Sequence, residues 1–465
     1  MEVIVNTLRK SFATNLTKSY EWRSAQLLAI EKLLDENQTE LLDALKQDLN
    51  KPNQESIVLE ISLIKNGIVH CLKNLKTWVQ PQKVNPIFQA RAVYSTYIQY
   101  QPLGVCLIIG AWNYPLMLTL VPLVGALASG NCAVVKPSEL SPNTAKVLEK
   151  LLPKYIDSDF VRVVNGGVPE TTKLLEQKFD HIFYTGNGTV GRIVMQAAAK
   201  HMTPVVLECG GKSPVYIDET ADLLVTAKRL AWGKFANAGQ TCIAPDYILC
   251  TKETQEKILP FLKQVFEEFY GDSVKKSDSY ARIVNERHFD RILNLIDQSK
   301  VVVGGESDKS QKFIAPTVMF NVTPEDKVMS EEIFGPVLPF ITVNNRQEAI
   351  DFINSRDKPL ALYVFANDDK IYEDFQNNTT SGSFGYNDVL VQVGFECVPF
   401  GGVGESGIGN YHGKFSIDTF SHQRAVLKTS FFGDSLSYFR YPPYSESKTN
   451  KAIWASSEFK SCNIL

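Results

Sequence analysis

The stretch YTGNGTVGRIVMQ, residues 184–196, could form a dinucleotide-binding turn. Gly186, Gly188 and Gly191 fit the spacing G-x-G-x-x-G, in which backbone N–H groups at the start of a helix face a pyrophosphate. The preceding sequence is strand-like and the following sequence is helical, as such a site requires. Glu208 follows about 20 residues later, where a ribose-binding carboxylate is expected. A tight strand-to-helix turn without a ligand would explain these glycines equally well.

Cys242 lies in a second glycine-containing loop, GKFANAGQTCIAPDY. Most free cysteines are small buried hydrophobic residues, but this one is surrounded by small and polar residues. A thiolate in such a loop could attack a carbonyl carbon, and nearby backbone N–H groups could stabilise the oxyanion that results. Asn113, in AWNYP at the end of an expected strand, could supply a neutral donor to the same oxyanion.

The composition excludes several classes of protein. A chain of 465 residues, 44% of them hydrophobic, exceeds one ordinary core, so we expect two or three domains. The net charge of −3 and the lack of a Lys/Arg block argue against a nucleic-acid partner. The eight cysteines contain no C-x-x-C pair, so we expect no metal site and reduced thiols in the cytoplasm. No signal peptide is evident at the N-terminus.

Short apolar strands alternate with helical stretches along most of the chain. Residues 101–135 carry no charge, but Pro and Gly interrupt them, so we expect a buried strand, helix and strand rather than a membrane span. The segments VCLIIGA, CAVVKP, VRVVNG, HIFYTG and VVLECGG predict a doubly wound parallel sheet. After Gly211, the segments SPVYID, YILC, VVVGG, TVMFNV and LPFITV predict a second α/β lobe. Amphipathic helices precede both, with a stop at Asn50–Pro52.

Several motifs in a fixed order together resemble the aldehyde dehydrogenase family, and most closely its class 3 branch, which includes fatty-aldehyde dehydrogenases. The matching stretches are PLGVCLIIGAWNYP, GNCAVVKPSE, FYTGNGTVG, LECGGKSP, GQTCIAPDY, EEIFGPVLP and GNYHGKFSIDTFSH. The resemblance implies an α/β fold with a Rossmann-type NAD-binding domain, an α/β catalytic domain and a small bridging strand element that supports a homodimer.

The domain boundaries implied by this resemblance are as follows. Residues 1–82 and 101–209 form the dinucleotide-binding domain, and residues 210–390 form the catalytic domain. Residues 83–100 and 391–430 form the bridging segments, in which ARAVYSTYIQY and the sequence after Gly394 are candidates for an arm-like strand pair. Residues 431–465 form a C-terminal tail.

The resemblance reassigns the acidic residue that follows the glycine turn. In the family the carboxylate of E-L-G-G-K is a general base, which implies that Glu208 activates water, while Lys136 and Glu139 of KPSE bind the adenosine ribose. The family Leu is replaced here by Cys209. We expect Cys209 to have a packing role, with oxidative coupling to Cys242 as the open alternative.

The remaining site residues are also carried over from the family's motifs. Glu332 and Phe334 of EEIFGP resemble the pair that binds the nicotinamide ribose and limits the position of the ring. Gly186 and Gly191 resemble the cofactor-turn glycines. Two further residues, Tyr114 and His412, are candidates for the substrate site, although an unassigned histidine is more often structural.

The implied reaction is the NAD(P)-dependent oxidation of medium- or long-chain aliphatic, or aromatic, aldehydes to carboxylic acids. Cys242 forms a thiohemiacetal and then a thioester, Asn113 and the Cys242 N–H hold the oxyanion, and Glu208 activates the hydrolytic water. Isoprenoid and carotenoid aldehydes stay open as substrates. Glu139 disfavours the 2′-phosphate of NADP by charge repulsion, although class 3 relatives often accept both cofactors.

The last four residues, CNIL, fit a prenylation signal at Cys462, and the final Leu favours a geranylgeranyl group. Such a lipid would place a cytoplasmic enzyme on the cytosolic face of a membrane, whereas the alternative is an ordinary exposed cysteine. Two other functions stay open for the whole chain. One is a thiol hydrolase or coenzyme-A-acylating enzyme that uses Cys242, and the other is a non-catalytic protein, which would be expected to lack Cys242 or Glu208.

Overall fold

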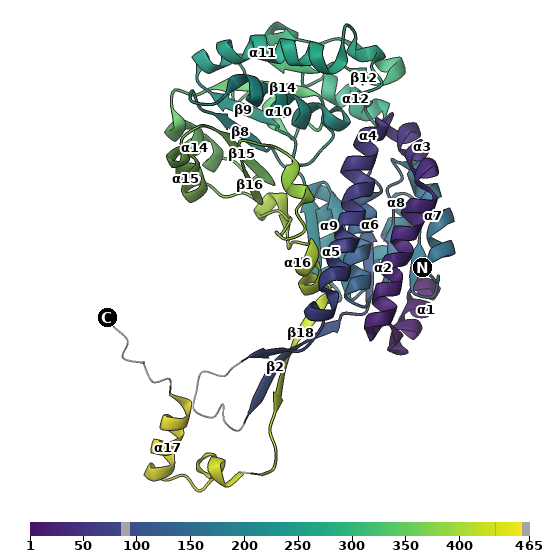
Figure 1. Cartoon of the computed structure of the whole chain (residues 1–465), viewed down its shortest axis with the longest axis vertical. Coiled ribbons are helices and arrows are strands. Elements are labelled where there is room, and N and C mark those ends of the chain that lie inside the picture. The colour runs from purple at the N-terminus through teal and green to yellow at the C-terminus, as the bar shows by residue number, and fades with distance from the viewer. Residues whose placement is uncertain (85–93, 433, 458–465) are drawn as a thin grey trace.

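The computed structural model describes residues 1–84, 94–432 and 434–457. Two α/β lobes lie one above the other, and a narrow arm of β-strands extends from the lower lobe towards the C-terminal helix (Figure 1). The lower lobe contains the N-terminal helices and one sheet, and the upper lobe contains a second sheet. The boundaries of the domains stay a prediction.

The first sheet has the strand order β17-β7-β6-β3-β4-β5. All neighbouring strands are parallel except β17, which is antiparallel to β7. The strands are β3 (Val105–Ile109), β4 (Cys132–Lys136), β5 (Val161–Val163), β6 (His181–Gly186), β7 (Val205–Cys209) and β17 (Gly407–Ile408). The five predicted strands are confirmed, and the chain reverses its direction of winding between β3 and β6, where α/β sheets usually bind ligands.

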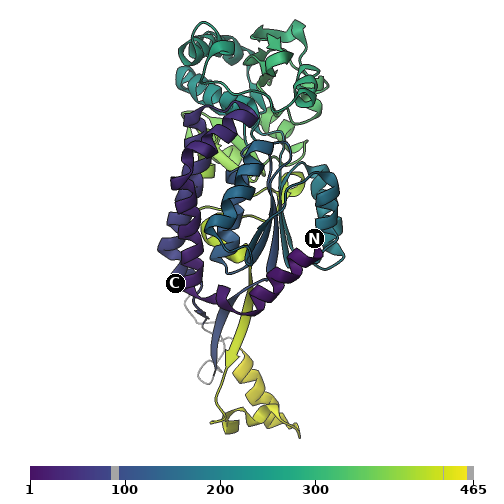
Figure 2. The same ribbon diagram turned by 90° about the vertical axis from the view of Figure 1, so that its right-hand side faces the viewer.

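Helices cover both faces of this sheet, as Figure 2 shows. One face packs on α2 (Tyr20–Glu36), α5 (Ser62–Trp78), α6 (Met117–Ala128) and α7 (Pro142–Tyr155). The other face packs on α1 (Glu2–Ala13), α8 (Val168–Leu175) and α9 (Gly188–Ala199). Neighbouring residues of β3 alternate between the two cores, since Cys106 and Ile108 belong to the first and Leu107 and Ile109 to the second.

The uncharged run of residues 101–135 forms β3, α6 and β4, as predicted. Every residue of α6 is buried between the sheet and the N-terminal helices, which explains why the helix has no polar face. In the part of the chain that the structure describes, no helix combines the length and the apolar character needed to cross a bilayer. The predicted helix stop is also confirmed, because α3 (Gln38–Leu49) ends before Asn50, which has a left-handed backbone conformation.

The second sheet has the strand order β10-β13-β14-β9-β8-β15-β16 and is parallel except for β10. Its strands are β8 (Pro214–Ile217), β9 (Tyr247–Cys250), β10 (Val301–Val303), β13 (Thr317–Met319), β14 (Val337–Thr342), β15 (Ala361–Phe365) and β16 (Ser383–Tyr386). The sequence prediction found the first five and missed β15 and β16. Helices α10 (Leu223–Phe235) and α11 (Lys252–Tyr270) pack on each other beside this sheet.

The arm is a long antiparallel pair of β2 (Ser95–Pro102) and β18 (Ser421–Lys428), with β1 (Gln82–Val84) on the far side of β2. Strand β2 confirms the predicted strand over the described part of residues 90–102, whereas residues 90–93 lie outside the described residues. The tail then forms α17 (Glu446–Ser456). Cys462 lies outside the described residues.

Asp48 links helix α3 to helix α7. One carboxylate oxygen accepts hydrogen bonds from the backbone N–H (3.0 Å) and the side-chain amide (2.8 Å) of Asn143. The other accepts from the backbone N–H (2.8 Å) and the hydroxyl (2.7 Å) of Thr144. A residue from a distant helix therefore satisfies the free N–H groups at the start of α7.

We predict that Asp48→Ala lowers the free energy of unfolding by about 1–3 kcal/mol, because it leaves buried donors at the start of α7 without an acceptor. Urea denaturation followed by circular dichroism measures the change. The matched control is Asp43→Ala on the exposed side of the same helix, which should change stability by less than about 0.5 kcal/mol. Equal effects of the two substitutions would contradict the capping role.

Candidate active site

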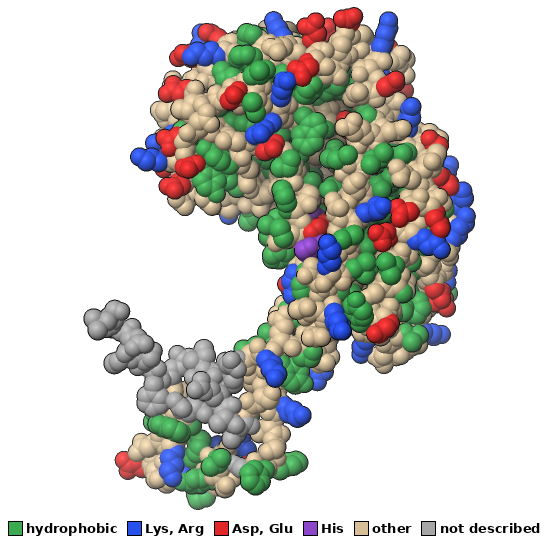
Figure 3. All heavy atoms as spheres, in the orientation of Figure 1, with side chains coloured by type: hydrophobic (Ala, Val, Ile, Leu, Met, Phe, Trp, Pro, Cys, Tyr) green, Lys and Arg blue, Asp and Glu red, His purple; other side chains and the backbone are tan. Residues whose placement is uncertain are grey.

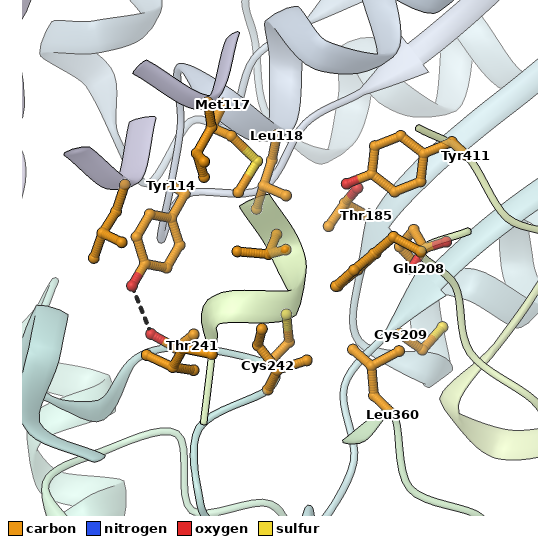
Figure 4. A pocket seen from close by; sticks show the side chains of 16 residues that line it. Tyr114, Met117, Leu118, Thr185, Glu208, Cys209, Thr241, Cys242, Leu360 and Tyr411 are labelled. Atoms are coloured by element: carbon orange, nitrogen blue, oxygen red, sulfur yellow. Dashed lines mark hydrogen bonds between the residues drawn. The ribbon is translucent and has the colours of Figure 1, made fainter. Parts of the chain in front are cut away.

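A pocket lies where the carboxyl ends of the first sheet's strands approach the loop after α10. Figure 4 shows Cys242 between the Tyr114–Thr241 pair on one side and a group of Glu208, Thr185 and Tyr411 on the other. Most of the remaining wall is apolar. The pocket thus combines a mostly apolar lining with a few polar groups, as small-molecule sites usually do.

Cys242 follows a short helical turn, η4 (Ala236–Gly239), whose residues Asn237 and Ala238 have left-handed backbone angles. The buried side chain of Gln240 holds this turn, since its amide donates to the Asn237 carbonyl (2.9 Å) and its oxygen accepts from the Val284 N–H (2.9 Å). Strained backbone of this kind persists only where the surroundings fix it. The Cys242 side chain is consequently presented, half-buried, to the pocket.

Most of the surroundings of Cys242 disfavour a negative charge on its sulfur, whereas two backbone N–H groups favour it. Burial raises the pKa of the thiol, and the carboxyl groups of Glu332 and Glu208 raise it further. The backbone N–H groups of Cys242 and Ile243 act in the opposite direction. These two N–H groups therefore mark the side of the sulfur where an anion is favoured, which is the property that an oxyanion site needs.

Glu208 stands at the end of β7 and is buried. Burial raises its pKa well above the ordinary value, because desolvation penalises the charged carboxylate. Neither carboxyl oxygen has a hydrogen-bond partner among the described residues. A buried polar group without a partner is costly unless it serves a ligand or water, so this carboxyl is suited to exchange a proton with a molecule in the pocket.

Two other residues of the pocket also carry a buried polar group without a hydrogen-bond partner in the described part of the chain, and the sequence analysis missed both. The Thr185 hydroxyl and the Tyr411 hydroxyl are buried and have no partner among the described residues. Thr185 lies directly opposite Glu208 in the pairing of β6 with β7, and Figure 4 shows both hydroxyl groups on the Glu208 side of the pocket. In the sequence, the only indication of a role is that Thr185 precedes Gly186 and Tyr411 precedes His412, both of which are candidate site residues.

The structure brings Asn113 and Tyr114 to the cysteine loop. The buried Asn113 side chain donates to the Gln240 carbonyl at 3.0 Å, two residues before Cys242. The Tyr114 hydroxyl is 2.8 Å from the Thr241 hydroxyl and lines the pocket. An amide nitrogen carries two N–H groups, so Asn113 keeps one donor beyond the bond to Gln240.

The residues expected to hold the adenosine half of the cofactor lie at the carboxyl ends of β4 and β6. The Lys136 ammonium donates to the Gly166 carbonyl at 2.9 Å and to the Glu139 carboxylate at 3.2 Å. A side chain on Gly186 would meet the Tyr184 hydroxyl, at 2.2 Å from the added Cβ. The backbone N–H groups at the start of α9, which begins at Gly188, come two residues after Gly186 in the sequence. This arrangement fits a dinucleotide phosphate beside a ribose-binding acid.

Glu332 and Phe334 come from the other lobe and lie close to the first. The Glu332 carboxylate covers Gly210, where an added Cβ would lie 2.0 Å from one of its oxygens. Burial, and then the neighbouring Asp246 carboxylate, raise the pKa of Glu332 to about 8. The Phe334 ring packs edge-on against Trp112, with 5.3 Å between ring centres. Glu332 lies close enough to Cys242 to raise the pKa of its thiol, and Phe334 packs on the residue before Asn113.

Comparison with known proteins agrees with this geometry. The model of the aldehyde dehydrogenase family matches residues 2–426. The chain belongs to the aldehyde dehydrogenase family. It is 50% identical to aldehyde dehydrogenase family 3 member A2 from Rattus norvegicus over 97% of this chain and 93% of that protein. It is 49% identical to the dimeric NADP-preferring aldehyde dehydrogenase from Mus musculus, over 95% of this chain and 97% of that protein.

A solved structure, the substrate-bound state of AldH from Staphylococcus aureus, superposes with a TM-score of 0.93 and 40% identity. The match covers 97% of this chain and 99% of that chain. The protein is therefore an NAD(P)-dependent aldehyde dehydrogenase that oxidises aldehydes to carboxylic acids. The α/β fold implied by the resemblance is confirmed.

His412 and Cys209 of this aldehyde dehydrogenase, for which the sequence analysis gave two alternatives each, both lie in packed environments. His412 is buried and is not among the residues that line the pocket. Burial lowers the pKa of its imidazole to about 4. Its ring lies against the ring of Tyr411, which does line the pocket. Cys209 packs against the start of α9, 3.3 Å from an added Cβ on Gly191. Burial raises the pKa of the Cys209 thiol to about 11, and because burial also raises the pKa of Cys242, the packing of Cys209, and not its acidity, distinguishes the two thiols. Both environments support structural roles.

We predict that thioester hydrolysis by this aldehyde dehydrogenase accelerates as pH rises through the elevated pKa of Glu208, because only the carboxylate can accept a proton. Acyl-enzyme decay, followed from about pH 6 to about pH 9, measures the profile. Glu208→Gln should remove the rise. Glu332→Gln is the matched control, since the Glu332 pKa of about 8 falls in the same window. A rise lost only in Glu332→Gln would make Glu332 the base.

Proposed function

We propose that this aldehyde dehydrogenase oxidises medium- and long-chain aliphatic, or aromatic, aldehydes, with Cys242 as nucleophile and Glu208 as general base. The observation that carries the proposal is the apolar pocket that contains both groups. Its apolar wall includes Leu59, Leu63, Met117, Leu118, Leu390 and Val393. Burial of an alkyl chain against such a wall contributes about 0.8 kcal/mol for each methylene group, which favours lipid-derived aldehydes.

In the proposed reaction the Cys242 thiolate adds to the aldehyde carbon, and the oxygen takes the electron pair. The free N–H of the Asn113 amide and the backbone N–H of Cys242 stabilise this oxyanion. A bound nicotinamide supplies the oxidising chemistry by accepting a hydride. Glu208 then removes a proton from a water molecule as that water adds to the thioester carbon. The Cys242 thiolate leaves, and the product is the carboxylic acid.

We propose that the cofactor is held by Lys136 and Glu139 at its adenosine ribose, by Gly186 and Gly191 at its phosphates, and by Glu332 and Phe334 at its nicotinamide end. The Glu139 side chain is 45% exposed, and its carboxylate lies 3.2 Å from the Lys136 ammonium. A 2′-phosphate at that position would be repelled. NAD is therefore the preferred cofactor, with NADP accepted more weakly.

The competing thiol-hydrolase and coenzyme-A-acylating reactions use the same cysteine. They differ in whether nicotinamide is needed and in whether water or a thiol takes the acyl group. The buried Glu208 carboxyl, whose oxygens have no partner among the described residues, supports water as the acceptor.

A stopped-flow measurement of NADH absorbance with a long-chain aldehyde tests the proposed roles. We predict no NADH formation with Cys242→Ala, because the other thiol of the pocket, Cys209, packs against the start of α9. With Glu208→Gln we predict a first turnover of NADH formation, followed by steady-state turnover slowed about 10²- to 10⁴-fold. Normal turnover by Cys242→Ala would place the nucleophile elsewhere.

We further propose a cytoplasmic homodimer in which residues 83–100 and 391–430 bridge the subunits. The other proposed units are a dinucleotide-binding domain (1–82 and 101–209), a catalytic domain (210–390) and a tail (431–465). The arm and tail expose Leu427, Phe431, Phe432, Leu436 and Trp454, and Figure 3 shows hydrophobic side chains gathered at this end. Such exposed apolar patches usually have a partner. A geranylgeranyl group on Cys462 would add attachment to the cytosolic face of a membrane.

Two shortened chains separate these proposals. A chain that ends at residue 457 keeps β18 and α17 but lacks Cys462, so it should stay dimeric and leave the membrane fraction of a eukaryotic host. A chain that ends at residue 420 lacks β18, the partner of β2, so light scattering should give about half the molar mass. Unchanged membrane binding of the first chain would contradict prenylation, and a dimer of the second would contradict the arm's role.

A further inference from the structure

A buried ion pair holds the loop that carries Asn113. The side chains of Lys51 and Glu60 are both fully buried, and the ammonium nitrogen is 2.5 Å from one carboxylate oxygen. Lys51 follows α3, and Glu60 lies in a π-helical turn, η2 (Ile57–Ile61). Turns of this type are rare and often occur at functional sites. Neither residue belongs to any of the motifs that identify the active site.

The pair contacts the loop between β3 and α6 at both of its ends. The Lys51 ammonium donates to the Asn113 carbonyl at 2.9 Å and lies 4.1 Å from the centre of the Tyr114 ring. The second oxygen of Glu60 accepts hydrogen bonds from the backbone N–H groups of Leu116 (2.8 Å) and Met117 (3.2 Å). One charge pair thus fixes the backbone on either side of Tyr114.

The same loop is joined to the turn before Cys242. The Asn113 carbonyl also accepts from the Asn237 side chain at 2.8 Å, and the Asn113 side chain donates to the Gln240 carbonyl at 3.0 Å. The position of the Asn113 amide relative to Cys242 is therefore set by its carbonyl, which Lys51 and Asn237 share, and by Gln240. A shift of the Lys51 ammonium would move this carbonyl directly.

Stability alone does not account for this arrangement. Burying two charges costs about as much as their attraction returns, and apolar side chains of similar volume often stabilise a core equally well. The charge pair supplies directed hydrogen bonds instead: Lys51 donates to a single carbonyl, and Glu60 accepts from two N–H groups. Loop geometry of that accuracy matters where a donor must meet a developing oxyanion within a few tenths of an ångström.

We propose that Lys51 and Glu60 are positioning residues for catalysis, which hold Asn113 where its amide can stabilise the oxyanion formed on attack by Cys242. This inference rests on the proposed role of Asn113. Both residues act through the loop and touch neither substrate nor cofactor. Their loss should therefore slow the step in which the oxyanion forms and collapses, while binding of NAD stays unchanged.

A double-mutant cycle tests the proposal. The pair variant Lys51→Met/Glu60→Gln removes both charges together, so that neither member of the pair stays behind as a lone buried charge, and it keeps an acceptor for the Leu116 N–H. In the wild-type background we expect single-turnover NADH formation at saturating NAD to slow about 10- to 100-fold. In the Asn113→Ala background the same pair of substitutions should change the rate less than about 2-fold, since the group that it positions is gone.

Lys65→Met is the matched control. It removes the ion pair between Lys65 and Asp35 (2.6 Å) in the same layer of helices, without contact to the Asn113 loop, and the rate should stay at the wild-type value. Fluorescence titration with NAD should give the same dissociation constant for all variants. If the pair variant fails to fold, Glu60→Gln alone carries the cycle with the same criteria.

The possible failures are distinguishable. A pair variant that slows the reaction by the same factor with and without Asn113 overturns the positioning role and leaves the proposed function intact. An unchanged rate for the pair variant in the wild-type background overturns it as well. If Asn113→Ala itself leaves NADH formation unchanged, the oxyanion role proposed for Asn113 fails, and the positioning role fails with it.

Discussion

Parallel pairing of β7, β6, β3 and β4 is the constraint on which the site depends. Parallel strands share one carboxyl edge, so residues that follow each strand meet there although they are far apart in sequence. Asn113 follows β3, Lys136 ends β4, Gly186 ends β6 and Glu208 stands near the end of β7. The two buried cores on either face of this sheet hold the edge rigid. This packing holds the side chains of the edge in place beside Cys242, which comes from the second lobe and lines the same pocket as Glu208.

The second constraint is desolvation. Burial is the largest cause of the raised pKa of Glu208, of Cys242 and of Glu332. Burying such groups without full hydrogen bonding lowers stability, and the extensive apolar cores offset this cost. The same desolvation strengthens every dipole that acts on a reacting carbonyl. The groups that destabilise the fold locally are therefore the groups to which we assign the proposed chemistry.

The sequence allowed the strands of both sheets up to β14 to be predicted, because each is a short apolar run bounded by Gly, Pro or polar residues. The sequence analysis missed β15 and β16, although β15 is also an apolar run, bounded by Pro359 and Asn367. Spacing alone suggested a ribose-binding role for Glu208, whereas the resemblance to a family implied a general base. The structure places Glu208 in one pocket with Cys242, which supports the second role, and that role stays a proposal.

The residues that sequence reasoning missed share a physical feature: their partners are distant in the chain. Thr185 matters because β6 pairs with β7, and Tyr411 because a segment after the second lobe returns to the first. Lys51 reaches Asn113 across 62 positions of sequence. Local patterns report on strands, helices and turns, whereas a catalytic site also needs the contacts that hold its loops against one another. Those contacts come from side chains that look like ordinary charged residues in the sequence, and burial separates the fully buried Lys51 from a half-buried lysine such as Lys65.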